Sequence, residues 1–140
     1  MKVVLTITGS QRFGTDEPEK TSLVTEGTLE REGDTLLLSY EESELTGMEG
    51  TTTVFRVEPA RITLQRSGTL ESQMVFALGH EDRSLYDMGF GALMITVLTD
   101  RLENTLTDAG GEMDVSYSVA IENETAGHID YHIHVRPQET

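Results

Sequence analysis

Apolar and polar residues alternate along almost the whole chain, and turn residues separate the alternating runs. Alternation places successive side chains on opposite faces, which is the pattern of a half-buried β-strand. Thr, Val, Ile and Tyr, which favour strands, are frequent in these runs. The pattern predicts about nine strands, within the segments 2–11, 21–32, 36–40, 51–58, 61–67, 74–78, 93–97, 115–121 and 129–135.

Two segments lack a clear strand pattern. The segment after Gly79, which ends in Tyr86-Asp87-Met88-Gly89-Phe90-Gly91, predicts a loop and a glycine-marked tight turn. Leu98, Leu102 and Leu106 are four residues apart, but the run is short and contains threonines. We interpret it as the end of a strand followed by a loop with one helical turn.

The short connections between the strands favour an antiparallel up-and-down order. A meander of eight or more strands hides its edges best when it closes on itself. The length of 140 residues fits one domain. We therefore predict an all-β fold, a single antiparallel up-and-down β-barrel of about 8–10 strands over residues 1–140, whose interior is wide enough for side chains or for one small ligand.

Composition removes several classes of function. The chain has no cysteine, so disulfides, thiolate metal sites and cysteine nucleophiles are excluded. The formal charge is −15, and no lysine or arginine cluster offers a phosphate backbone or an anionic membrane a binding surface. No apolar run in the sequence is long enough to predict a signal peptide or a membrane span. We expect a cytoplasmic protein, and a basic protein is the macromolecular partner that this charge would suit.

A charged residue lies at the end of an inward-facing run. By alternation Arg66 continues the face of Ile62 and Leu64, and Glu42 continues the face of Leu38 and Tyr40. An isolated buried charge is very costly, so such residues lie at a barrel mouth or form a pair. Arg66 therefore either binds the anionic head of a ligand at the mouth, or pairs with a glutamate and closes one end of the barrel.

Aromatic residues would surround such a mouth. Tyr40, Phe76 and Tyr117 lie on the predicted inward faces, and Tyr86 with Phe90 forms either a packing pair or a pair lining the mouth. The set Arg66, Tyr40, Phe76, Tyr86, Phe90 and Tyr117 is the candidate ligand site. The inward residues also include Phe55, Met74 and Tyr131, and their bulk argues against a large cavity.

The last predicted strand is rich in histidine. His128, Asp130, His132 and His134 share one face, opposite to an apolar set. Imidazole and carboxylate groups are good ligands for zinc, nickel or iron, and His132 with His134 could place two nitrogens on one ion. A third ligand could come from His80 or from a glutamate on a neighbouring strand. The alternative is a solvated outer face, on which polar residues are expected. No other cofactor is predicted.

Several short motifs together resemble a known family. In chain order they are Leu38-Ser39-Tyr40-Glu41-Glu42 with Gly47 after it, Arg66-Ser67-Gly68, Met74-Val75-Phe76 with Gly79, Tyr86 with Met88 and Phe90-Gly91, and the strand that contains Tyr117. The chain resembles the YwiB-like family of uncharacterised bacterial proteins. The resemblance implies a calycin-like, lipocalin-like β-barrel and implies no activity. The histidine-rich last strand departs from the family pattern.

Three classes of function remain open. The first is non-enzymatic binding of a small, mostly apolar ligand in or at the mouth of the barrel, which rests on analogy with the fold. The second is a protein–protein interaction module, such as a homodimer, with a structural or regulatory role. The third is a metal-binding protein or metalloenzyme that uses His132 and His134. The sequence favours a non-enzymatic role, because it contains no nucleophile motif.

Overall fold

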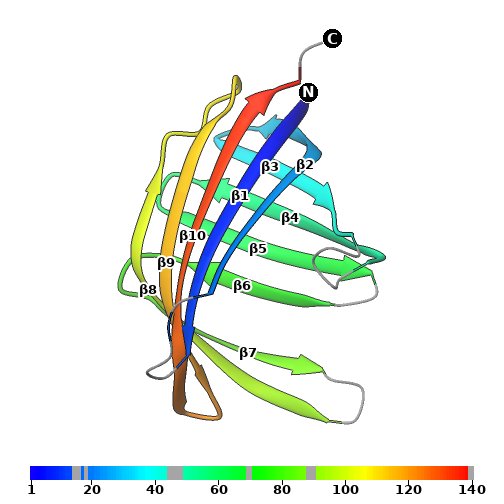
Figure 1. Cartoon of the computed structure of the whole chain (residues 1–140). Helices are drawn as coiled ribbons and strands as arrows, with labels where there is room; N and C mark the ends of the chain where they lie inside the picture. The colour runs from blue at the N-terminus through cyan, green and yellow to red at the C-terminus, as the bar shows by residue number, and fades with distance from the viewer. Residues whose placement is uncertain (14–16, 18, 44–48, 69–70, 88–90, 139–140) are drawn as a thin grey trace.

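The computed structural model describes residues 1–13, 17, 19–43, 49–68, 71–87 and 91–138, and describes only the backbone at Phe13, Tyr86 and Asp87. These residues form ten strands and no helix (Figure 1). The strands are β1 (Lys2–Phe13), β2 (Glu19–Glu32), β3 (Thr35–Glu41), β4 (Thr51–Glu58), β5 (Arg61–Gly68), β6 (Ser72–Phe76), β7 (Glu81–Asp87), β8 (Ala92–Asn104), β9 (Gly111–Ile121) and β10 (Glu124–Pro137).

All ten strands belong to one antiparallel sheet in the order β6-β5-β4-β3-β2-β1-β10-β9-β8-β7. Each strand except the edge strands pairs with its neighbours in sequence, and the first strand pairs with the last. The start of β1 and the end of β10 therefore lie side by side at one end of the molecule (Figure 1). The sheet curls into a nearly closed barrel, which confirms the predicted antiparallel up-and-down fold.

The two edge strands, β6 and β7, come from the middle of the chain. Their backbones are bridged by side chains: the Val75 amide donates to Asp82 Oδ2 at 3.0 Å, and the Ser84 hydroxyl donates to the Gln73 carbonyl at 3.1 Å. Free backbone groups on a sheet edge invite pairing with other chains. The side chains of Asp82 and Ser84 on β7 form hydrogen bonds with two of these backbone groups on β6. Side chains, rather than backbone pairing, therefore connect the two edge strands.

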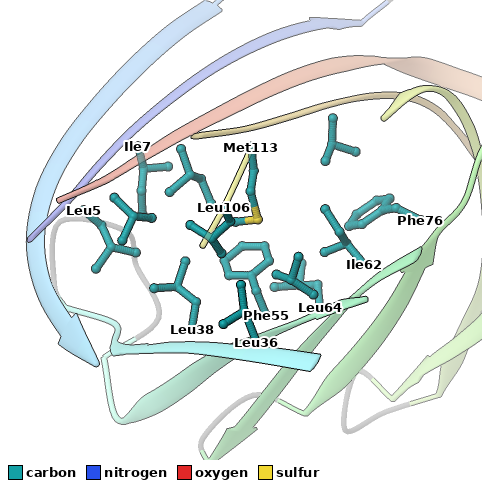
Figure 2. Close-up of a cluster of buried hydrophobic side chains, with 14 of the residues drawn as sticks. Leu5, Ile7, Leu36, Leu38, Phe55, Ile62, Leu64, Phe76, Leu106 and Met113 are labelled. Atoms are coloured by element: carbon teal, nitrogen blue, oxygen red, sulfur yellow. The ribbon is translucent and has the colours of Figure 1, made fainter. Parts of the chain in front are cut away.

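The inward faces of the strands form one apolar core. Figure 2 shows buried side chains from both sides of the barrel meeting in its interior, among them Leu5 and Ile7 from β1, Leu38 from β3, Phe55 from β4 and Met113 from β9. On β1, β3 and β4 the buried residues alternate with more exposed ones, as the sequence pattern predicts, whereas on β9 Ser116 is buried together with its neighbours Val115 and Tyr117.

One glycine lets neighbouring strands approach closely in this core. A Cβ at Gly27 on β2 would lie 2.3 Å from the Ser39 carbonyl oxygen and 2.8 Å from a methyl carbon of Leu5. Any side chain at this position would force β2 and β3 apart. Gly27 therefore helps to set the spacing of the strands next to Tyr40.

Two sequence predictions are wrong. The segment after Gly79 forms strand β7 where a loop was predicted, and the predicted turn at Met88-Gly89-Phe90 lies outside the described residues. The strand shows no apolar alternation because its residues Asp82 and Ser84 bond the edge of β6. The helical turn between Leu98 and Leu106 is absent. β8 runs on to Asn104, and its register with β9 shifts between Thr99 and Arg101. Leu98 is therefore exposed whereas Leu102 packs against the core, so the leucines spaced by four do not share one face.

Candidate functional site

Arg66 is a positively charged residue on the inward face of the barrel. It lies near the end of β5, opposite Thr53 on β4 and Ser72 on β6. Thr53 is fully buried, and Ile62 and Leu64 precede Arg66 on the same face of β5. Arg66 thus occupies the position that alternation predicts, at the end of the barrel where β3 and β5 finish and β4 begins.

Arg66 borders a small cavity of about 30 Å³. The cavity is also lined by Phe55, Leu64, Phe76, Val115, Tyr117 and Tyr131. Arg66 Nε is buried, and it has no hydrogen-bond partner among the residues that the structure describes. A buried N–H group without an acceptor costs free energy, so this group calls for an explanation.

A polar network lies next to Arg66. Glu42 is only 6% exposed, and its Oε1 accepts a hydrogen bond from the Thr53 hydroxyl at 2.8 Å. The Tyr40 hydroxyl donates to Glu42 and is also hydrogen-bonded to Tyr131. Glu42 is not among the residues that line the cavity, so its carboxylate is directed to this network.

Burial keeps the two tyrosines of the network protonated. It raises the pKa of Tyr40 far above the ordinary value of a tyrosine, and the neighbouring Tyr131 and Glu42 raise it further. Burial also raises the pKa of Tyr131, although the hydrogen bond with Tyr40 and the charge of Arg66 oppose that rise. Both hydroxyls therefore remain hydrogen-bond donors at neutral pH.

Aromatic rings surround the polar groups. The Phe55 ring lies 6.5 Å from that of Tyr40 and 6.2 Å from that of Tyr131, and the rings of Phe76 and Tyr117 are 4.8 Å apart. These separations are typical of packed aromatic pairs. The rings fill most of this end of the barrel, in agreement with the bulk of the inward residues in the sequence.

The structure brings together most of the predicted ligand residues that it describes. Arg66, Phe76 and Tyr117 line one cavity. Tyr40 is hydrogen-bonded to Tyr131, which lines the same cavity. Phe90 and the side chain of Tyr86 lie outside the described residues. Tyr131 and Thr53 are two site residues that sequence reasoning did not select. Alternation on β10 and β4 places both inward, but nothing in the sequence shows that they meet Arg66.

The histidine-rich face of β10 lies on the outside of the barrel. In the sheet register, His132 lies between Thr8 on β1 and Asp114 on β9, and Asp130 lies between Ser10 and Ser116. These neighbours, with Lys20 on β2 and Arg101 on β8, line an open groove of about 400 Å³. The location agrees with the interpretation of this face as an outer one.

Most of the outer histidines already contact carboxylates. His132 Nδ1 lies 2.7 Å from Asp114 Oδ1, and His132 Nε2 lies 4.0 Å from Glu112 Oε1. His128 contacts two different acids, Asp130 at 3.3 Å and Asp100 at 3.7 Å. Within the described residues no three His, Asp or Glu side chains converge on a metal position in this conformation.

No helix long and apolar enough to cross a membrane occurs in the part of the chain that the structure describes.

Comparison with known proteins supports the fold and leaves the activity open. The sequence profile of a domain of unknown function, DUF1934, matches residues 5–133. The solved structure of the ywiB protein from Bacillus subtilis has a TM-score of 0.77 to this chain, with 19% sequence identity, over 95% of this chain and 90% of that one. Among curated proteins, none matches the sequence. At this identity the structural likeness shows the fold alone.

Proposed function

The chain belongs to the DUF1934 family of unknown function, and we propose that it is a non-enzymatic binding protein for a small, mostly apolar molecule with an anionic head group. The observation that carries this proposal is the buried Nε of Arg66, which has no hydrogen-bond acceptor among the described residues. A carboxylate or a similar head group would supply that acceptor and would also neutralise the guanidinium.

The surroundings of Arg66 favour such a ligand. Tyr131 also lines the cavity, where its protonated hydroxyl, which is hydrogen-bonded to Tyr40, adds an uncharged polar group to the same lining as Arg66. The remaining lining is apolar or aromatic, which suits an alkyl or aryl carbon next to the head group. A few polar groups in an apolar lining are typical of small-molecule sites.

The size of the cavity limits how the ligand binds. About 30 Å³ admits a group little larger than a water molecule. The head group would therefore lie inside, against Arg66, while the apolar body lies toward the mouth. An entirely enclosed ligand, such as a large barrel could hold, does not fit this interior.

Octanoate is a suitable probe, because it joins a carboxylate to a flexible apolar chain, and octanol is its uncharged counterpart. We expect octanoate to raise the melting temperature of the protein and octanol to have little effect. The octanoate shift should disappear in Arg66→Met. It should persist in Arg61→Met, because Arg61 lies exposed at the other end of β5, where it pairs with Glu58 of β4. Circular dichroism of Arg66→Met would check that the variant is folded.

Native mass spectrometry of untagged protein isolated from its source cells gives an independent test. The expected result is a small-molecule adduct that leaves on denaturation and that Arg66→Met lacks. A polypeptide mass without adduct, combined with no octanoate shift, would overturn the proposal. An adduct retained in Arg66→Met would also overturn it, because the ligand would then bind elsewhere.

A further inference from the structure

His132 on the outer face is held in an orientation that suits a metal ligand. Its Nδ1 lies 2.7 Å from Asp114 Oδ1. A carboxylate can only accept a hydrogen bond, so Nδ1 carries the proton and the neutral ring has its free lone pair on Nε2. Metal-binding histidines are commonly oriented in this way by a carboxylate on the other ring nitrogen.

The free nitrogen faces a second carboxylate. His132 Nε2 is 4.0 Å from Glu112 Oε1, a separation too long for a hydrogen bond. Zinc binds nitrogen and oxygen ligands at about 2.0–2.2 Å, which puts two such atoms roughly 3.3–3.6 Å apart at a tetrahedral angle. A shift of a few tenths of an ångström would therefore allow one ion to bind both atoms.

The sheet register supplies a third ligand. His134 is two residues from His132 on the same face of β10, and it is the direct cross-strand partner of Glu112 on β9. On an antiparallel pair, directly opposed residues have Cβ atoms about 4.5–5.5 Å apart. His132, His134 and Glu112 thus form a compact triangle on two neighbouring strands.

We propose that His132, His134 and Glu112 bind one divalent transition-metal ion of the zinc class, with Asp114 as the residue that positions His132. The three side chains do not converge in the present conformation. The side chains of His132 and Glu112 are 37% and 54% exposed, so a change of rotamer there displaces no core packing. The fourth position would remain open to water, since three protein ligands are present.

The donor set predicts which ions bind. Two imidazoles and one carboxylate suit Zn²⁺ or Ni²⁺. Mg²⁺ and Ca²⁺ prefer oxygen ligands and should bind weakly or not at all. This site lies on the opposite face of the sheet from Arg66, so it is independent of the proposed ligand site.

Isothermal titration calorimetry of the untagged, metal-free protein with Zn²⁺ tests the proposal. We expect one ion per chain, a Zn²⁺ affinity at least about tenfold lower in His132→Ala, His134→Ala and Glu112→Gln, and a loss of about 10–100-fold in Asp114→Asn. Native mass spectrometry should show the same single ion, and Mg²⁺ should give no heat of binding.

Two matched controls separate a built site from general attraction to an acidic surface. His128→Ala removes a histidine from the same face of β10, and Glu103→Gln removes a carboxylate from β8 whose side chain is 63% exposed. Both should bind Zn²⁺ as the unmodified protein does. The proposal is overturned if no Zn²⁺ binds, or if His128→Ala and Glu103→Gln weaken binding as much as His132→Ala and Glu112→Gln.

Discussion

The protein carries two polar clusters on opposite faces of the same strand. On β10, Tyr131 points inward to Glu42 and Arg66, whereas His132 points outward to Asp114. The inner groups are buried on folding, so the hydrogen bonds that they made to water must be replaced by hydrogen bonds within the protein. The outer groups keep access to solvent. A polar contact of similar length should therefore matter far more for stability on the inner face than on the outer one.

The largest expected difference comes from removing one carboxylate on each face. Glu42→Ala leaves the buried hydroxyls of Thr53 and Tyr40 without their acceptor and should lower the free energy of unfolding by about 3 kcal/mol. Asp114→Ala removes a partly exposed contact to His132 and should cost less than about 1 kcal/mol. Urea denaturation of both variants measures the difference, and equal losses would show that the inner network is solvated.

A smaller effect is expected from adding a methyl group to the inner face. Gly27→Ala brings a Cβ within 2.3 Å of the Ser39 carbonyl oxygen, and overpacking of this kind costs about 1–3 kcal/mol. Gly9→Ala on β1 is the control, because its Cβ would approach no atom closer than 3.3 Å, the Thr21 hydroxyl. Thermal melting compares the two variants, and a tolerant Gly27→Ala would show that β2 and β3 can separate without loss.

The third effect depends on pH. Burial raises the pKa of Tyr40 and Tyr131 in the folded state above the value of about 10 that they have when unfolded. Above pH 10 the unfolded chain loses these protons while the folded protein keeps them. Stability should therefore fall as pH rises, by up to about 1.4 kcal/mol per pH unit for each tyrosine.

Chemical denaturation between pH 9 and pH 11 measures this fall, and Tyr131→Phe should make it shallower. Absorbance of tyrosinate in the folded protein provides a second readout. If Tyr40 and Tyr131 ionise near pH 10 without unfolding, the inner face is more hydrated than its burial indicates.

Much of the fold could be predicted from the sequence, because alternation is a local property. The inward positions of Leu38, Phe55 and Arg66 follow from the residues beside them on the same strand. β7 could not be predicted, since its inward residues Asp82 and Ser84 bond a strand edge instead of joining the core. The register shift in β8 between Thr99 and Arg101 could not be predicted either, because it appears only in the pairing of β8 with β9.

The sequence by itself determined the fold class, the inward direction of Arg66 and the shared face of His132 and His134. Only the tertiary structure decided which groups meet. Tyr131 is 65 positions after Arg66 in the chain, yet both line one cavity, and Asp114 reaches His132 through the pairing of β9 with β10. Strand pairing and the closure of the barrel set these contacts. A pattern of period two records the face on which a side chain lies, but not its partner across the sheet.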